Sequence, residues 1–337
     1  LSVLGILLSW ILSNGKLFLI CIGLSFLSCI GITGRFYYDK YVDTIPVIKE
    51  VKVDITEYSP FLKDSKVAKF NYESSLKLSE DLPKIDGATA LYPMYSSFVN
   101  ATYPEKIYDP ENSEVLCSTT SKAYENLING KVDVIFCAEP SKKQIDVALT
   151  NGIHFKMTPI GKEAFVFFVN SKNKVKNISS NNIKNIYSGR IKNWFAISGS
   201  FSSIKVFQRP ENSGSQTMLE KIIGDEKIIE PLKNDVIDGM GEIIKHTADY
   251  KNYKNAIGYS FLYYSTQMVQ NGSIKLLSID NVYPSKDTIK DGTYPYSSSF
   301  YAITRSETTE NTKKLIDWIL SKEGQFLVKK TGYVPIK

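Results

Sequence analysis

Short apolar runs alternate with segments of helical periodicity from Lys84 onward, and this alternation predicts an α/β fold. Three runs, SEVLCSTT at 113–120, VDVIFCAEP at 132–140 and EAFVFFVN at 163–170, are typical of strands. Before these runs a helix is expected at 91–104, because apolar residues recur there at i, i+3, i+4 and i+7: Leu91, Met94, Tyr95 and Phe98. Strands that alternate with helices are usually parallel, so we expect a mainly parallel sheet.

The size and charge of the chain narrow its class further. With 337 residues, 43% of them hydrophobic and 23% charged, the chain is long enough for about two globular domains. The net charge of +6 is spread along the sequence, and its densest clusters are pairs such as Lys142-Lys143 and Lys329-Lys330. No basic stripe with interleaved aromatic residues is present, so nucleic acid is not an expected partner.

The N-terminal segment, residues 1–33, is interpreted as a membrane anchor or uncleaved signal segment. Residues 17–33 are apolar, no charge lies between Lys16 and Arg35, and the length is near the lower limit for a membrane span. A cleaved signal peptide and a buried core helix are the alternatives. Residues 1–12 are also apolar, as at the end of another span in a longer chain. Residues 34–83 are expected to form a juxtamembrane arm, to which no function is assigned.

The cysteines and histidines do not indicate a catalytic or metal site. Cys117 and Cys137 each end a strand-like run, which favours two buried thiols over a disulfide between them. No Cys/His spacing typical of a metal site is present, and no metal or cofactor is expected. Neither His154 nor His246 adjoins a nucleophile motif, so catalysis by a pair such as Ser213 and His246 is disfavoured and the chain is not expected to be an enzyme.

Small polar residues mark four junctions at which a strand leads into a helix. Because ligands of α/β proteins bind where such junctions gather, and helix N-termini carry unpaired N–H groups and partial positive charge, the junctions predict a site for an anion. The alternative is that these serines and threonines only cap their helices. The four junctions are DGATAL at 86–91, CSTTSK at 117–122, CAEPS at 137–141 and RPENSGSQT at 209–217.

The fourth junction adds a cation to these small hydroxyl groups. The guanidinium of Arg209 can hold two oxygens of a tetrahedral anion, whereas its alternative role is a surface ion pair. The hydroxyls of Thr89, Thr120 and Ser213 are candidate donors to the same anion. The pattern therefore predicts a small oxyanion as the ligand.

Five segments in order resemble the substrate-binding proteins of phosphate ABC importers, within the type II periplasmic-binding-protein superfamily. The similarity covers residues 84–337 and leaves the N-terminal segment and the arm outside it. The segments are DGATALYP at 86–93, IYSGRIKNW at 186–194, the pattern Arg209-x-x-x-Ser213-Gly-Ser215, AIGY at 256–259 and GYVP at 332–335.

The resemblance implies a set of ligand-binding residues. Thr89 would give a hydroxyl, Ala90 a backbone N–H, and Thr120 stands where the family has a serine. Ser215 replaces the family's usual threonine and keeps the hydroxyl. The family also uses an aspartate near CAEPS to accept the proton of the anion, and the nearest carboxylate here is Glu139, for which both a ligand role and a turn toward solvent remain open. The second half of the site would consist of Arg209, Ser213, Gly214 and Ser215.

The resemblance also implies two lobes joined by two hinge crossovers, with the anion between them. The first lobe is expected at 84–169 and 260–337, and the second at 170–259. The implied function is extracytoplasmic binding of phosphate, or a similar tetrahedral oxyanion, for delivery to the permease subunits of an ABC importer. A surface anion sensor or scaffold with the same fold is the first alternative, and a surface phosphatase is the second.

Overall fold

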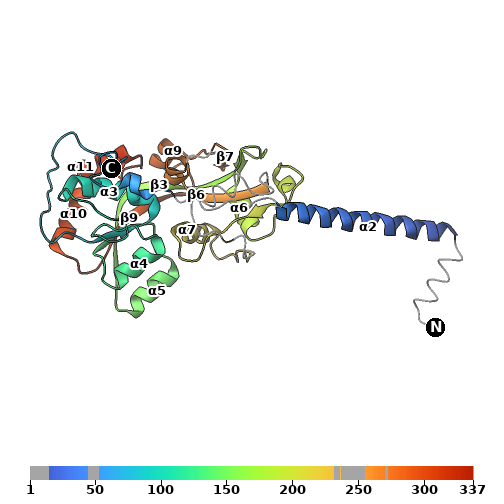
Figure 1. Cartoon of the computed structure of the whole chain (residues 1–337), viewed down its shortest axis with the longest axis horizontal. Helices are drawn as coiled ribbons and strands as arrows, with labels where there is room; N and C mark the ends of the chain where they lie inside the picture. Colours follow the sequence, from blue (N-terminus) through green and yellow to red (C-terminus); the bar gives the residue numbers. More distant parts are fainter. Residues whose placement is uncertain (1–14, 45–52, 231–235, 237–254, 270–271, 337) are drawn as a thin grey trace. The chain divides into compact units, whose positions relative to one another are not determined.

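The computed structural model describes residues 15–44, 53–230, 236, 255–269 and 272–336 (Figure 1). The chain divides into two compact units, Leu1–Lys49 and Glu50–Lys337. Residues 1–12, whose apolar sequence is interpreted as the end of another span, lie outside the described part of the chain.

The described part of the first unit is a long helix, α2, which runs from Gly15 to Thr44. Within it, Leu19–Tyr37 is long and apolar enough to cross a membrane, and no part of this stretch is buried. This makes α2 a candidate anchor. The helix extends eleven residues beyond the predicted end of the segment at Thr33, because the sequence from 34 to 44 contains no proline to end it.

The second unit is built around one seven-stranded sheet. Six of its strands lie in the order β1-β2-β9-β3-β6-β5, and β7 also pairs with β3. A separate two-stranded sheet pairs β4 with β8. The bounds are β1 Ile85–Gly87, β2 Val134–Cys137, β3 Phe155–Asn170, β4 Asn177–Ile178, β5 Lys205–Val206, β6 Ala256–Phe261, β7 Ile274–Leu276, β8 Ser278–Ile279 and β9 Ser297–Arg305.

The sheet is mixed, and the expectation of a mainly parallel sheet is wrong. The pairs β1–β2 and β5–β6 are parallel, as expected for strands connected through a helix. Strands β9 and β3, however, pair antiparallel with all their neighbours in this sheet. Residues 113–120 do not form the expected strand either, since only Val115 bridges to Ile85. The polar end of that segment binds Asp86 through Ser118 instead.

The long strand β3 belongs to both lobes. Its first part, Phe155 to Pro159, pairs with β9, and its last part, Phe165 to Val169, pairs with β6. The β3–β9 register shifts between Pro159 and Gly161. In Figure 1, β3 runs from the lobe of α3, α4, α10 and α11 toward the lobe of α6, α7 and β6. Strands β3 and β9 are therefore the two crossovers of the two-lobed fold.

Each lobe has its own apolar core. The first core contains Ile85, Phe98 and Phe136, and the second contains Phe167 and Trp194. The second core also takes in residues from beyond the predicted lobe boundary at 259. We therefore propose that the second lobe continues to about residue 296 and that β9 begins the return to the first lobe. These additional core residues are Leu277, Ile279, Ile289, Tyr294 and Tyr296.

Helices cover the sheet in both lobes. In the first lobe they are η2 Thr89–Leu91, α3 Tyr92–Thr102, α4 Thr120–Ile128, α5 Lys142–Thr150, α10 Glu310–Leu320 and α11 Lys322–Thr331; in the second they are α6 Ser180–Tyr187, η3 Trp194–Ile197, α7 Gly214–Ile223, η6 Tyr264–Met268 and α9 Lys286–Lys290. Helix α3 begins with Pro93 in its first turn, a position that proline favours.

Apart from Val53, which packs against the second core, residues 53–83 of the predicted arm pack against the first lobe. This segment contains one short helix, η1 Ile55–Tyr58. Tyr58, Val67 and Leu78 are buried in the first core. The carboxylate of Glu323 accepts hydrogen bonds from the backbone N–H and the hydroxyl of Ser75, at 3.0 and 2.7 Å. We therefore propose that most of this segment belongs to the first lobe.

Candidate anion-binding site between the lobes

A buried carboxylate, Asp86, joins the two loops of the first lobe that were predicted to bind the ligand. It is the middle residue of β1 and has no exposed surface. Its Oδ1 accepts from the backbone N–H groups of Gly87 and Ser118, at 2.7 and 2.9 Å. Its Oδ2 accepts from Nδ2 of Asn126 at 2.8 Å and from the Ser118 hydroxyl. Four hydrogen bonds to one carboxylate fix the loop after β1 beside the loop before α4.

These two loops lead into helices that lack a side-chain cap. Helix η2 begins at Thr89 and α4 begins at Thr120, and in both cases the N-cap side chain makes no capping hydrogen bond. The residue before α4, Thr119, has a left-handed φ of 80°. The capping alternative therefore fails at these two junctions, whose N–H groups keep the partial positive charge that attracts anions.

The two other junctions do carry caps. Ser141 forms a capping box with Gln144 at the start of α5. Ser213 caps α7, with its Oγ accepting from the backbone N–H of Gln216. An oxygen that accepts in a cap still has its own hydrogen, so the Ser213 hydroxyl retains a donor for an anion.

Ser215, in the first turn of α7, provides the clearest sign of a missing partner. Its side chain is 1% exposed, and its Oγ is buried without a hydrogen-bond partner in the part of the chain that the structure describes. Buried hydroxyl groups in proteins are almost always hydrogen-bonded, because leaving one unpaired costs about 1–3 kcal/mol. A polar ligand at this helix start would satisfy the group.

The backbone of Arg209 is fixed by two buried side chains. Its N–H donates to Oε1 of Gln216 at 3.0 Å and to Oη of Tyr259 at 2.9 Å. Burial raises the pKa of Tyr259 far above its usual range, against the opposing effect of the Arg209 N–H and charge, so this phenol stays neutral. The loop is thus held in place by contacts that do not involve the guanidinium.

A small cavity lies where the two lobes meet. Three of the predicted ligand residues line it: Ala90 and Thr120 from the first lobe and Gly214 from the second. A Cβ atom on Gly214 would lie 3.1 Å from Oγ1 of Thr120, so glycine allows the start of α7 to approach the start of α4 closely. The other lining residues are Ala88, Leu91, Ala138, Glu163, Phe261, Ser298, Ser299 and Phe300.

The lobes also touch across the cleft through Asn212. Its backbone carbonyl accepts from Oγ of Ser121 at 2.9 Å and from Nε2 of Gln144 at 3.2 Å. Its side-chain Oδ1 accepts from Oγ of Ser141 at 2.8 Å. All three donors belong to the first lobe and Asn212 to the second, so the structure has the cleft closed.

The carboxylate of Glu139 binds a residue from each lobe and does not line the interlobe cavity. Its Oε2 pairs with Nζ of Lys221 on α7 at 2.5 Å, and its Oε1 accepts from Oη of Tyr301 at 3.0 Å. Burial works to raise the pKa of Glu139, but the hydrogen bonds from Lys221 and Tyr301 and the Lys221 charge lower it overall. Its predicted role as a ligand stays a prediction; both oxygens already have partners here.

Three polar residues that line the cavity were not predicted from the sequence. Glu163 comes from β3, and Ser298 and Ser299 come from β9. The available signal was the carboxylate itself, since Glu163 precedes an uninterrupted apolar run that predicts a buried strand. A carboxylate in a buried strand is rare without a partner or a function.

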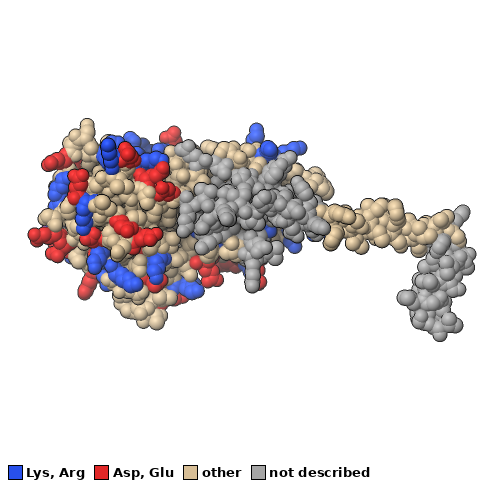
Figure 2. All heavy atoms as spheres, in the orientation of Figure 1, with Lys and Arg blue, Asp and Glu red and all other residues tan. Residues whose placement is uncertain are grey.

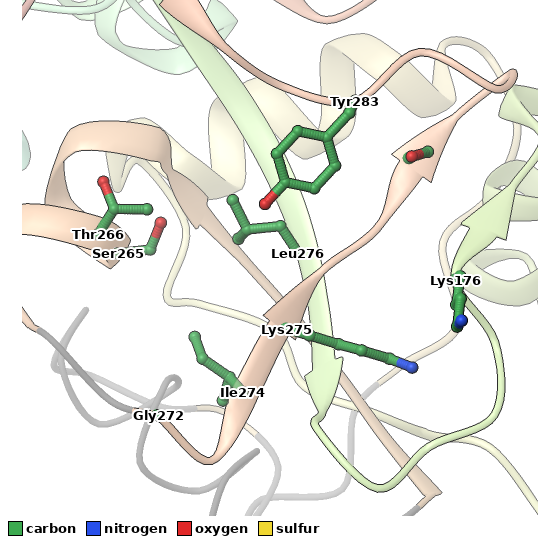
Figure 3. A pocket seen from close by; sticks show the side chains of 9 residues that line it. Lys176, Ser265, Thr266, Gly272, Ile274, Lys275, Leu276 and Tyr283 are labelled. Carbon is green, nitrogen blue, oxygen red and sulfur yellow. The ribbon is translucent and has the colours of Figure 1, made fainter.

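A second, larger pocket lies in the second lobe (Figure 3). It contains two lysines, Lys176 and Lys275, and the hydroxyl of Tyr283. Burial, with the nearby Lys176 charge, lowers the pKa of Lys275, whose Nζ donates to the carbonyl of Asn173 at 2.5 Å. None of the predicted ligand residues lines this pocket, so the interlobe cavity is the candidate site.

Among the described residues, neither the surface charges nor the cysteines indicate a binding site for a small anion other than the interlobe cavity. Lysine, arginine and acidic residues are interspersed over the face in Figure 2. Cys117 and Cys137 are free thiols, and burial raises the pKa of both, that of Cys117 to about 12. No group of three potential metal ligands gathers among the described residues. His246 lies outside them.

Residues 80–323 match the family model described as the PBP superfamily domain. The chain belongs to this family. Its sequence is 33% identical over 149 residues to the phosphate-binding protein PstS 2 of Streptococcus agalactiae, a match that covers 41% of this chain and 48% of the relative. It is 25% identical over 274 residues to the phosphate-binding protein PstS of Borreliella burgdorferi, a match that covers 77% of this chain and 91% of the relative. The first of these matches thus spans about half the length of the relative.

Solved structures agree with the two-lobed fold. A putative phosphate ABC transporter substrate-binding protein with bound phosphate from Clostridium perfringens superposes with a TM-score of 0.60 at 24% identity, covering 77% of this chain and all of that one. An ABC-type phosphate transport receptor from Vibrio cholerae superposes with a TM-score of 0.55 at 18% identity, covering 77% of this chain and 99% of that one. The expected fold class is confirmed.

Proposed function

We propose that this protein binds inorganic phosphate, or a similar tetrahedral oxyanion, in the interlobe cleft for delivery to an ABC importer. The observation that carries the proposal is the buried hydroxyl of Ser215, which has no hydrogen-bond partner among the described residues. It lies at a helix start that meets two uncapped helix starts across the cleft. Its relatives from Streptococcus agalactiae and Borreliella burgdorferi are named as phosphate-binding proteins, which supports phosphate as the first ligand to test.

The proposed site holds the anion by hydrogen bonds from both lobes. The backbone N–H of Ala90 and the hydroxyls of Thr89 and Thr120 would donate from the first lobe. The N–H groups at the start of α7 and the hydroxyls of Ser213 and Ser215 would donate from the second. Arg209 would supply the counter-charge, and charge-assisted bonds of this kind are about twice as strong as neutral ones. The site binds its ligand without changing it, so we infer a binding protein and not an enzyme.

Delivery to an importer follows from closure of the cleft. A ligand that bridges both lobes stabilises the closed form, and permease subunits can distinguish a closed from an open protein. Helix α2 would keep the protein at the cell membrane with its binding unit outside the cell. Genes for a permease and an ATPase beside this one would support transport over the sensor alternative.

Calorimetric titration of the full chain in detergent with phosphate, sulfate and molybdate tests the proposal. We expect saturable binding of phosphate at one site per chain. Heat with molybdate or sulfate alone would assign the site to another oxyanion, and no binding of any of the three would contradict the proposal. Turnover of generic phosphate esters would favour the phosphatase alternative.

Replacing Asn212 should weaken closure and therefore binding. Asn212→Gly removes the hydrogen bond from Ser141 but keeps a residue that tolerates the φ of 64° at this position. The loss of one interlobe hydrogen bond, worth about 0.5–1.5 kcal/mol, should raise the Kd for phosphate about two- to twelvefold. Calorimetry measures the change.

A matched control for this variant is Asn281→Gly. Asn281 also has a left-handed φ, 68°, and its Oδ1 accepts from Nδ2 of Asn177 at 2.9 Å, but both residues belong to the second lobe. The control should bind phosphate as the wild type does. Equal Kd values for Asn212→Gly and the wild type would show that this contact does not contribute to closure.

Deleting residues 1–33 should give a protein that stays in solution without detergent and still binds phosphate. The deleted part contains most of the apolar stretch Leu19–Tyr37, whereas every proposed ligand residue lies in the unit Glu50–Lys337. Sedimentation after high-speed centrifugation and calorimetry check the two expectations. A truncated chain that is unfolded or cannot bind would contradict the role of this segment as a detachable anchor.

A further inference from the structure

A pair of aromatic side chains projects from the surface of the second lobe. Phe195 and Phe201 are 64% and 85% exposed, and their ring centroids lie 5.1 Å apart. Most of the apolar area of both rings remains in water, which the hydrophobic effect disfavours. Scattered single apolar residues are ordinary on a protein surface, whereas two large rings held together are a candidate contact surface.

The loop that carries the pair, residues 194–202, is fixed by the second core. Trp194 at its start is buried, and its Nε1 donates to the carbonyl of Asn255 at 2.9 Å. The backbone N–H of Trp194 donates to the carbonyl of Ser202 at 3.0 Å, and that of Gly199 donates to the carbonyl of Trp194 at 2.8 Å. A Cβ atom on Gly199 would lie 2.7 Å from Cβ of Trp194, so glycine is needed for the chain to fold back this closely. The core thus holds both phenylalanines in an outward position.

Three exposed lysines lie around this loop. The same Cβ atom on Gly199 would lie 3.1 Å from Cγ2 of Val175, so the loop packs on Val175, between Lys174 and Lys176 in the sequence. Lys192 lies at the base of the loop, where its carbonyl accepts a backbone hydrogen bond at 2.8 Å. The aromatic pair is therefore accompanied by positive charge from two separate segments of the chain.

The charge of this part of the chain has one sign. Residues 164–210 contain eight lysines and arginines and no aspartate or glutamate. Two of the eight have other roles, since Arg190 pairs with Glu226 and Arg209 belongs to the cleft. The remaining six are lysines, and a run of lysines without carboxylates to neutralise it attracts an anionic surface.

A lipid bilayer is the large partner that the chain itself predicts. Helix α2 contains the candidate span Leu19–Tyr37. Nine residues after the end of α2 at Thr44, Val53 already packs against the second core. Nine residues reach at most about 32 Å when fully extended, so anchorage by α2 would tether the second lobe to the bilayer by a short connection. Phenylalanine enters the boundary between headgroups and acyl chains, and lysine binds anionic headgroups beside it.

We propose that Phe195, Phe201 and the lysines at 174, 176 and 192 form a docking surface for the anionic phospholipid headgroups of the membrane that α2 crosses. This inference goes beyond the proposed function and does not depend on which anion the cleft binds. Its consequence is a division of labour between the lobes. The second lobe rests on the membrane, and the first lobe is the part that moves when the cleft opens and closes.

The test places a fluorescent side chain in the docking surface of the full chain. Phe201→Trp is made in a Trp10→Phe background, because Trp10 lies in the apolar N-terminal segment, and the protein is reconstituted in nanodiscs with brominated acyl chains. In phosphatidylcholine with about 30% phosphatidylglycerol, the bromines should quench the added indole about twofold. Quenching should fall in discs of phosphatidylcholine alone. It should fall equally in anionic discs when Lys174→Gln, Lys176→Gln and Lys192→Gln are combined.

Phe326→Trp, in the same Trp10→Phe background, is the matched control. Phe326 lies on α11 of the first lobe, is 48% exposed and has Lys330 over its ring at 5.8 Å. It thus combines an exposed ring with a lysine outside the docking surface, and its replacement should keep its emission in every disc. Equal emission changes for Phe201→Trp and Phe326→Trp overturn the proposal, as does quenching at 201 that ignores both lipid charge and the lysine replacements.

A measurement on the wild type needs no substitution. The backbone amides of residues 195–202 should exchange hydrogen several-fold more slowly in anionic than in neutral discs, and equal rates would overturn the proposal. A chain that does not stay with the discs would remove the anchor and the docking surface together. Calorimetry of phosphate with the same samples tests the proposed function separately, because every proposed ligand residue lies outside the docking surface.

Discussion

Arg209→Ala is expected to weaken phosphate binding by about 2–4 kcal/mol, or about 30- to 1000-fold in Kd. The guanidinium would be the cation that pairs with the anion in the closed cleft, and losing one partner of a buried charge-assisted pair is costly. The fold should survive, because the Arg209 backbone N–H is held by Gln216 and Tyr259, contacts that alanine can also make. Calorimetry gives the affinity, and a thermal unfolding curve checks the fold.

Arg190→Ala is the matched control for this variant. Arg190 is also in the second lobe, but its side chain is 52% exposed and pairs with Glu226 at the surface. Removing such a pair changes little, so phosphate affinity should equal that of the wild type. If Arg209→Ala binds phosphate as tightly as Arg190→Ala does, Arg209 is not a ligand and the counter-charge must come from elsewhere.

The sequence predicted the two-lobed α/β fold but not the direction of its central strands. Helical periodicity at 91–104 corresponds to η2 and α3, and the runs at 132–140 and 163–170 contain β2 and the end of β3. The prediction of a mainly parallel sheet was wrong because β3 and β9 cross between the lobes and run antiparallel to their neighbours. An apolar run in the sequence does not reveal which strand pairs with it. The strand predicted at 113–120 is absent because Ser118 binds Asp86, and the sequence does not reveal this contact between residues far apart in the chain.

The candidate site was predictable at helix starts and unpredictable at the hinge. Loops with small polar residues before a helix carry a local signal, which located Thr120 and Gly214 at the cavity. Glu163, Ser298 and Ser299 sit within or beside apolar strand runs, and their common surface arises only when the two crossovers pair. Glu139 illustrates the reverse case, since its position in the sequence indicated a ligand but its partners, Lys221 and Tyr301, come from other elements.

Glu163 should make the stability of the protein depend on pH without any ligand. Its pKa in the folded chain, about 8, lies above the 4.5 usual for a glutamate. The folded state therefore holds a proton that the unfolded chain releases, and this contribution is complete below pH 4.5 and is lost as the pH rises toward 8. Each tenfold change in the acidity constant corresponds to about 1.4 kcal/mol, so the wild type should lose about 3 kcal/mol between pH 5.5 and 8.5 from this group.

Comparison with Glu163→Gln separates the stability lost through Glu163 from the pH-dependent contributions of the other carboxylates. Glu114 and Glu139 have lowered pKa values, so their contributions are lost at acidic pH, in the opposite direction, and they are present in both proteins. Urea denaturation in anion-free buffer, followed through tryptophan fluorescence, to which the buried Trp194 and Trp318 contribute, gives the free energy of unfolding at each pH. The variant should gain about 3 kcal/mol relative to the wild type between pH 5.5 and 8.5. Curves that stay parallel would mean that Glu163 is ionised in the folded chain at neutral pH.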